Sequence, residues 1–350
     1  MKKMILALGT IVLTGLGLVA LYLVLGPTQR LEPARVVSIR KGESLTSAAR
    51  TLAQAGVVRS ALVFALYTET SGKASRIQPG DYAFNGRERM ADVLRHLVNG
   101  DFMVVAVTIP EGMTVHQIGE RLEQAGLVCD NEFDTAAVDG PIPQALGLGP
   151  LGAEGFLFPA TYRFSPLVGT GQVLVAMLAR FYAILTPQVE ERMFELGLSE
   201  REVVTLASII EKEAKAPGER PIIASVFYNR LGLGMPLQSD PTAQYNSAGE
   251  TAPAAAAVHA ASAFNTYGFA GLPPGPIANP GQSSILAALY PARTDYLYFV
   301  ARNDGTHIFS RSFREHERAI EEVRRAAAPA RAHRGQVSGK TQRYPDSPSA

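Results

Sequence analysis

The N-terminal segment constrains the chain most, because residues Met4 to Gly26 form an uncharged, apolar stretch of 23 residues. At about 1.5 Å of rise per residue, a helix of this length spans roughly 34 Å, which is enough to cross the hydrocarbon core of a bilayer. Lys2 and Lys3 precede it, and flanking positive charge tends to stay on the cytoplasmic side. We therefore expect residues 1–28 to be a cytoplasmic N-terminus and a transmembrane anchor that directs the rest of the chain outward.

A cleaved signal peptide is the alternative interpretation of the same segment. The apolar region of a signal peptide is normally about 7–15 residues long and is followed by an A-x-A-like cleavage site. The apolar run here is longer, and the residues around Gly26 and Pro27 offer no such site. The uncleaved anchor is favoured.

Charge, cysteine content and missing motifs exclude several classes of function. The 33 Lys and Arg residues balance 32 Asp and Glu residues, so a nucleic-acid partner is not expected. Cys129 is the only cysteine, which excludes an intrachain disulfide and cysteine-rich metal sites. The six histidines form no close pair, and no P-loop, dinucleotide fingerprint or G-x-S-x-G motif occurs. The sequence thus predicts neither a metal nor a cofactor.

The region after the anchor predicts a strand–helix–helix–strand unit. A strand is expected at residues 36–40, a helix at 44–56, a second helix beginning after the cap Ser60, and an extended segment at 80–84. A shift of 70 residues superposes Gly42, Leu52 and Gly56 on Gly112, Leu122 and Gly126, which indicates an internal repeat.

The remainder of the chain predicts a mixed α+β domain. A helix is expected around residues 90–98, a strand around 102–109, a strand or loop at 154–164, and a hairpin from 296–300 and 307–309. Residues 327–350 lack periodicity and are expected to be a mobile tail.

The segment from Ser199 to Glu213 carries the clearest signal for chemistry. Ser199 and Glu202 have the spacing of a capping box, and an almost wholly apolar helix follows. Glu211 and Glu213 stand at its end, about 200° apart around the helix. A carboxyl group desolvated there has a raised pKa, which suits a general acid.

We expect Glu211 to be that acid. It shares a face with Ala207 and Ser208, whose small side chains leave room for a substrate, whereas Glu213 faces larger apolar side chains. In the alternative, both glutamates are surface residues paired with Lys212 or Lys215.

Two loops, residues 235–245 and 264–267, combine amide, hydroxyl, carboxylate and aromatic groups of the kind that bind sugars. Together with the apolar helix they complete a series of motifs that resembles the YceG-like family of endolytic murein transglycosylases. The segments that carry the resemblance are LASIIEKE at 206–213, ASVFYNRL at 224–231, LQSDPT at 237–242, NTY at 265–267 and GLPPGPI at 271–277.

The resemblance implies an α+β protein with a single transmembrane helix, a LysM-like βααβ module at residues 36–104 and a catalytic domain at 105–326. It implies an inner-membrane, single-pass protein whose periplasmic part cleaves the MurNAc–GlcNAc bond of nascent peptidoglycan and leaves a 1,6-anhydromuramyl end. Peptidoglycan synthases are a further class of expected partner. The family's catalytic glutamate corresponds to Glu211, and substrate contacts are expected from Glu154, Ser208, Asn229, Gln238, Ser239, Asp240, Tyr245, Asn265 and Tyr267.

Two segments depart from the family pattern. Ala160 stands where an acidic residue is common, and residues 251–262 are rich in alanine, so roles at these positions are not carried over. Two other functions remain open at this point. One is a non-catalytic peptidoglycan-binding scaffold, and the other is a lyase that uses pyridoxal phosphate on Lys212 or Lys215.

Overall fold

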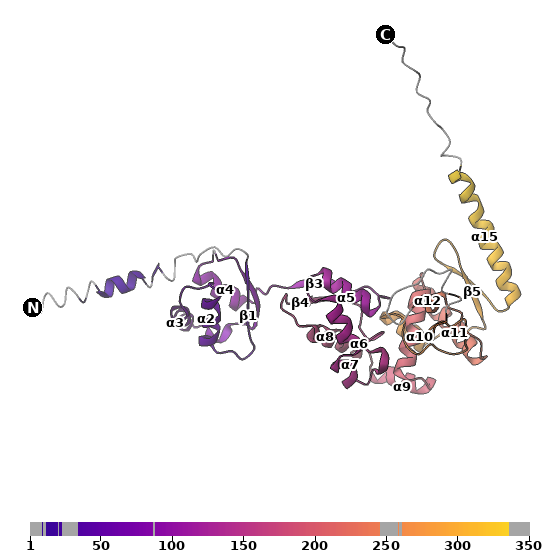
Figure 1. The fold of residues 1–350 in the computed structure, drawn as a ribbon, viewed down its shortest axis with the longest axis horizontal. Helices are drawn as coiled ribbons and strands as arrows, with labels where there is room; N and C mark the ends of the chain where they lie inside the picture. Colours follow the sequence, from indigo (N-terminus) through magenta and orange to yellow (C-terminus); the bar gives the residue numbers. More distant parts are fainter. Residues whose placement is uncertain are drawn as a thin grey trace, which may run out of the picture. The chain divides into compact units, whose positions relative to one another are not determined.

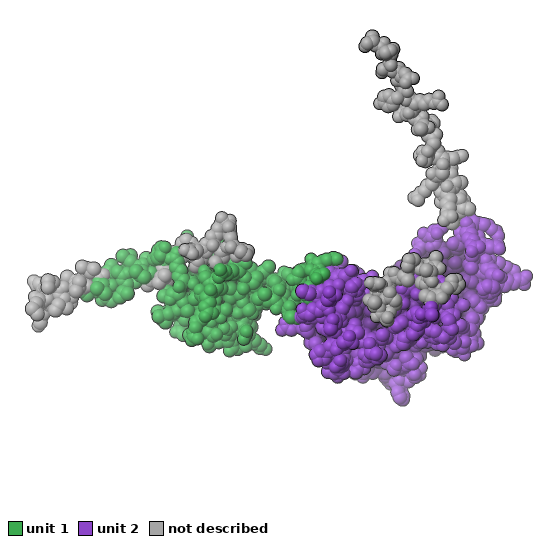
Figure 2. Space-filling view, in the orientation of Figure 1, with its two compact units in different colours: residues 1–107, 122–128, 161–169 green, residues 108–121, 129–160, 170–350 purple. Residues whose placement is uncertain are grey.

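The computed structural model describes residues 34–86, 88–245, 258 and 261–335, together with residues 9, 12–19 and 21–22 of an N-terminal helix. The chain forms two compact units, shown in green and purple in Figure 2. Unit 1 comprises residues 1–107, 122–128 and 161–169, and unit 2 comprises residues 108–121, 129–160 and 170–350. Each unit is described by itself below.

The predicted membrane span lies only partly within the described residues. Residues 9, 12–19 and 21–22 are helical and exposed, and the remainder of residues 4–26 lies outside the described part. Among the residues that the structure does describe, no single helix is long and apolar enough to cross a membrane. Helices α8 (Thr170–Tyr182) and α9 (Pro187–Leu196) meet the length and composition criteria only as a pair, which is bent by 71°. The transmembrane anchor stays a prediction.

Unit 1 begins with the predicted strand–helix–helix–strand order, which the structure confirms (Figure 1). The Ser44 and Ser60 hydroxyls accept backbone N–H groups at the starts of α2 and α3, which fixes both helix origins. Strands β1 and β2 pair antiparallel, with Val37 opposite Tyr82 over a buried core. The elements are β1 (Arg35–Ile39), α2 (Leu45–Gln54), α3 (Ala61–Thr70), the 3₁₀ helix η1 (Ala74–Arg76), β2 (Gly80–Phe84) and α4 (Met90–Asn99).

The internal repeat is also confirmed. Strand β3 (Val105–Thr108) and helix α5 (Val115–Gln124) begin 70 residues after β1 and α2. The repeated glycines share a conformation, with φ of +80° and +77° at Gly42 and Gly112, a region that favours glycine. Helix α6 (Asp130–Val138) follows α5 as α3 follows α2, and β4 (Thr161–Phe164) pairs with β3 as β2 pairs with β1. The chain therefore repeats the βααβ arrangement, with the short helix α7 (Pro141–Ala145) added before β4 in the second copy.

Unit 2 is built around helix α10, which packs against α11, α12 and α14. Eight consecutive residues of α10, Val203 to Ile210, are buried, which explains the unbroken apolar run in its sequence. The elements of this part are α7 (Pro141–Ala145), η2 (Gly149–Leu151), α8 (Thr170–Tyr182), α9 (Pro187–Leu196), α10 (Glu200–Glu213), η3 (Pro217–Glu219), α11 (Arg220–Gly232), α12 (Asp240–Gln244), α14 (Gln282–Leu289), β5 (Tyr298–Ala301), β6 (His307–Ser310) and α15 (Phe313–Gly335).

One expectation about local structure needs correction. Helix α15 continues to Gly335, so the first part of the predicted tail is helical, and residues 336–350 lie outside the described part. The aromatic segment 154–164, expected to be a strand or loop, contains both. Thr161–Phe164 is a strand, and Glu154 and Phe156 are buried in the turns that precede it.

Candidate active site

The end of helix α10 carries the candidate site. The predicted capping box forms at its start, where the Glu202 carboxylate accepts the Ser199 N–H at 2.8 Å and Ser199 Oγ accepts the Glu202 N–H at 3.3 Å. At its other end, Glu211 and Glu213 leave the helix on different sides and contact different partners. The predicted separation of the two carboxylates is therefore confirmed.

Glu213 lines a pocket of about 410 Å³ between α10, the loop before α12 and the β5–β6 hairpin. The Ser239 hydroxyl donates to its Oε1 at 2.6 Å. Burial raises the pKa of Glu213 to about 7, with a smaller contribution from the negative charge of Asp240, while the Ser239 hydrogen bond acts in the opposite direction. The Glu213 carboxyl group can therefore both donate and accept a proton near neutral pH.

The loops that surround Glu213 are joined to each other by hydrogen bonds. Thr266 receives the Gln238 N–H on its carbonyl and the Ser239 N–H on its hydroxyl, both at 3.1 Å. The Tyr267 hydroxyl donates to Asp240 at 2.6 Å. Gln238 has a φ of +52°, a conformation unusual for a residue with a side chain. The structure thus brings together four predicted site residues, namely Gln238, Ser239, Asp240 and Tyr267, around a glutamate that the sequence analysis did not select.

Arg230 holds this wall of the pocket in place. Its side chain is buried and donates to the carbonyls of Pro236, Leu237 and Leu297 and to the Gln238 side chain at 2.7–3.1 Å. The sequence analysis missed this residue, although it lies in the quoted motif at 224–231. It also missed further residues that line the pocket, which are Tyr298, Phe299, His307, Phe313 and His316.

Glu211 occupies a different environment and requires a correction. Its side chain is 6% exposed and accepts an ion-pair hydrogen bond from Arg220 at 3.0 Å and the Gly281 N–H at 3.0 Å. The reason for preferring it was wrong, because Ala207 and Ser208 beside it are fully buried and leave no room for a substrate. Glu211 instead ties α10 to the first residue of α11 and to the N-cap of α14.

Two further predicted substrate contacts, Ser208 and Asn229, have side chains that the fold itself uses. Ser208 is fully buried, donates to the Thr205 carbonyl and accepts the Ile277 N–H. The Asn229 amide donates both of its hydrogens, to the carbonyls of Thr294 and Tyr296, each at 2.9 Å.

The remaining predicted contacts lie elsewhere in unit 2. Glu154 and Tyr245 line a second pocket of about 380 Å³, whose lining shares no residue with the first. Asn265 is buried and donates to the Val258 carbonyl. Ala160 accepts the Ile109 N–H through its backbone, and most of the alanine-rich loop lies outside the described residues.

Glu154 is a buried carboxyl group that accepts hydrogen bonds from distant parts of the chain. It accepts the Val115 N–H at 3.1 Å, the Tyr245 hydroxyl at 3.3 Å and the Asn279 amide at 3.0 Å. Burial raises its pKa to about 7 in spite of these bonds. Since Glu154 joins the start of α5 to two distant segments, its contacts are those of a residue that holds the fold together.

Comparison with known proteins places these features in a family. Residues 37–322 match the model of the YceG-like family. A Bacillus subtilis protein named endolytic murein transglycosylase is 34% identical over 305 residues, which are 81% of this chain and 83% of that protein. A Streptococcus pneumoniae protein of the same name is 29% identical over 319 residues, and the chain spans 58% of its length.

A solved structure supports the same fold. The crystal structure of a YceG-like protein from Listeria monocytogenes is similar to the chain, with a TM-score of 0.56 and 30% sequence identity. The similarity covers 81% of this chain and 98% of the Listeria chain.

Proposed function

The chain belongs to the YceG-like family, and we propose that it cleaves the MurNAc–GlcNAc bond inside peptidoglycan strands with Glu213 as the general acid and base. As a relative of proteins named endolytic murein transglycosylase it is a lytic transglycosylase that acts on peptidoglycan, and not a scaffold without activity. The bond cleaved, the product and the catalytic residue are our proposal. The observation that carries the proposal is a carboxyl group with a pKa near 7 in a pocket lined by polar and aromatic side chains.

The proposed reaction needs one carboxyl group in two protonation states. Protonated Glu213 donates its proton to the glycosidic oxygen as the bond to C1 breaks. The resulting carboxylate then takes the proton of the C6 hydroxyl, which attacks C1 and closes the 1,6-anhydro ring. No water enters, and Glu213 returns to its protonated state. The Ser239 hydroxyl at 2.6 Å fixes the orientation of the carboxyl group throughout.

The walls of the pocket suit a sugar polymer. Tyr267 and Phe313 offer aromatic faces against which sugar rings pack, and Gln238 and Asp240 are exposed hydrogen-bonding groups. Asp240 also carries negative charge that stabilises a positive oxocarbenium-like centre at C1. Hydrolysis would use water in place of the C6 hydroxyl and would normally need a second carboxylate about 5–10 Å away.

We also propose that the chain acts outside the cytoplasm while anchored in the membrane. Support comes from the apolar residues 4–26 and from the two lysines before them. The βααβ unit at residues 36–84 is consistent with the LysM-like module that the family resemblance implies. Peptidoglycan synthases stay a proposed class of partner.

Mass spectrometry of the products tests this function. We expect the full-length protein in detergent to convert uncrosslinked glycan strands into products about 18 Da lighter than their hydrolysed counterparts, the mass of one water molecule. The Glu213→Gln variant should release them about a thousandfold more slowly. Products with ordinary reducing ends would show that the protein is a hydrolase. Anhydro products released by both proteins at similar rates would refute the role of Glu213.

A further inference from the structure

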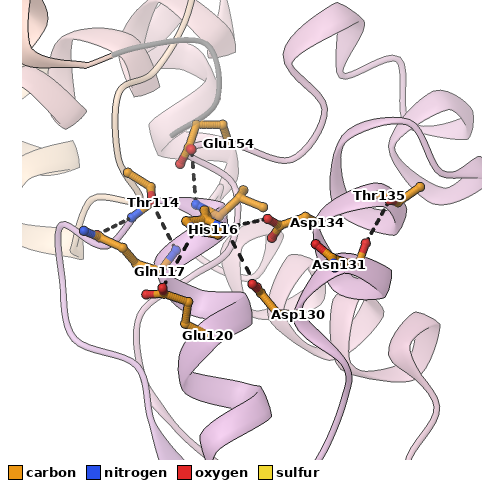
Figure 3. A network of polar contacts seen from close by, with 10 residues as sticks. Thr114, His116, Gln117, Glu120, Asp130, Asn131, Asp134, Thr135 and Glu154 are labelled. Atoms are coloured by element: carbon orange, nitrogen blue, oxygen red, sulfur yellow. Dashed lines mark hydrogen bonds and ion pairs between the residues drawn. The ribbon is translucent and has the colours of Figure 1, made fainter. Parts of the chain in front are cut away.

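A second cluster of ionisable side chains lies between α5 and α6 (Figure 3). Helix α5 presents His116 and Glu120, one turn apart, and α6 presents Asp130 and Asp134, also one turn apart. His116 Nδ1 lies 2.7 Å from Asp134 Oδ2 and 3.9 Å from Asp130 Oδ1, and His116 Nε2 lies 3.8 Å from Glu120 Oε1. Three carboxylates therefore converge on one imidazole.

The cluster carries more negative charge than positive charge. Asp134 and Glu120 form ion pairs with His116, and neither forms one with a lysine or arginine within the described part of the chain. The second carboxylate oxygen of Asp134 is buried and receives no hydrogen bond from the described residues. Because an unpartnered buried oxygen is costly, this side of Asp134 is suited to a cation.

A glycine provides the space for this cluster. Gly119 lies on α5 between His116 and Glu120, and a Cβ atom there would lie 2.4 Å from Asp130 Oδ1 and 2.9 Å from Asp134 Oδ1. Any side chain at position 119 would displace the carboxylates. The helix surface is thus shaped to admit the carboxylate oxygens of α6.

The internal repeat supplies a comparison, because the first βααβ copy has the same scaffold without the cluster. Counting 70 residues back on α5 places Thr46, Ala49 and Arg50 at the positions of His116, Gly119 and Glu120. Counting from the helix N-caps, Ser60 and Cys129, places Ala61 and Ala65 at the positions of Asp130 and Asp134. This alignment also pairs Phe64 with Phe133, both fully buried. The fold therefore does not require these groups, and all five positions differ together.

We propose that His116 Nδ1, Asp130 and Asp134 bind a divalent first-row transition-metal ion, while Glu120 lies beside Nε2 on the other side of the imidazole ring. The ligand atoms of the first three residues lie within 4.8 Å of one another. Bonds of about 2.0–2.2 Å require only modest side-chain rotation to close this space around zinc. The ion would join α5 to α6 next to the pocket that contains Glu154.

The donor set determines which ions are expected. One imidazole nitrogen and two or three carboxylate oxygens suit Zn²⁺ or Mn²⁺, whereas Ca²⁺ and Mg²⁺ prefer oxygen ligands alone. The sequence analysis predicted no metal because it searched for closely spaced histidines. Here the histidine is joined by carboxylates from the following helix.

Calorimetric titration of the metal-free, full-length protein with zinc chloride tests the site. We expect one equivalent of zinc to bind at the cluster. His116→Gln and Asp134→Asn should each weaken that binding at least about tenfold. Zinc should also raise the melting temperature of the wild type more than that of either variant. Calcium binding, where present, should be unchanged in His116→Gln.

His96→Gln is the matched control, because His96 pairs with a single carboxylate, Asp101, at 2.8 Å. This variant should bind zinc like the wild type. Circular dichroism melts without metal identify a variant that has lost its fold. Gly119→Ala keeps every ligand but displaces the Asp130 and Asp134 carboxylates, so it should also weaken zinc binding. Zinc binding that is absent, or equal in the wild type and both ligand variants, would refute the site and leave an ion-paired cluster.

Discussion

The two glutamates at the end of α10 are two residues apart, yet their surroundings give them opposite properties. Glu211 meets the Arg220 guanidinium and a backbone N–H, which fix the position of its side chain. Glu213 meets a single hydroxyl in a pocket and has a pKa of about 7. Burial alone therefore does not make a carboxyl group an acid catalyst. The partner that burial brings with it decides between a structural ion pair and a proton donor.

The largest expected effect separates the two residues by activity. Glu213→Gln should lower turnover of glycan strands by about a thousandfold, since general acid–base catalysis contributes roughly 10²–10⁴-fold. Glu211→Gln should retain turnover within a few fold per folded molecule. Product release per folded protein, measured at a temperature where both variants are folded, checks this prediction. Loss of turnover in Glu211→Gln alone would reverse the assignment.

The second-largest expected effect distinguishes Glu211 from Glu213 by the stability of the folded protein. Glu211→Gln removes the nearer of the two carboxylates that pair with the largely buried Arg220, Glu211 at 3.0 Å and Glu111 at 3.8 Å, and breaking a buried pair costs roughly 3–5 kcal/mol. We expect a loss of about 3 kcal/mol, seen as a clear fall in melting temperature. Glu213→Gln should cost little or nothing, because a neutral side chain is already favoured there.

An exposed ion pair provides the control for that measurement. Arg192 and Glu195 lie 2.6 Å apart, with side chains 29% and 55% exposed. Glu195→Gln should therefore cost under about 1 kcal/mol. Equal losses in Glu195→Gln and Glu211→Gln would mean that the Glu211 pair is not a structural tie.

The smallest effect concerns the pH dependence of Glu213. The protonated acid is lost as the pH rises through its pKa, so activity should fall above about pH 7. Ser239→Ala removes a bond that lowers this pKa and should move the fall to higher pH, with about tenfold less activity. Asp240→Asn removes a charge that raises the pKa and should move the fall to lower pH. Shifts in the same direction would contradict the proposed environment of Glu213.

Local elements were predictable because their signals are short in sequence. The caps Ser60 and Ser199, the paired glycines of the repeat and the antiparallel hairpin near the C-terminus all follow from neighbouring residues. The angle between Glu211 and Glu213 was predictable for the same reason, since helix geometry alone sets it.

The choice between the two glutamates was not predictable from these signals. Ser239 lies 26 residues after Glu213, and Gly281 lies 70 residues after Glu211. Nothing in the helix sequence specifies which of these segments returns to which face. The cluster around His116 escaped notice for a similar reason, because its ligands come from two helices and include only one histidine.

The chain crosses between the two units several times, which limits how the protein can be divided by proteolysis or by recombination. The sequence passes between unit 1 and unit 2 five times, because residues 122–128 and 161–169 return to unit 1. No single cut therefore releases either unit whole, by protease or by gene truncation. A fragment ending at residue 107 would lack two segments of unit 1. Unit 1 as a whole is thus not an exchangeable cassette, and recombination that moves all of it must carry part of unit 2 with it.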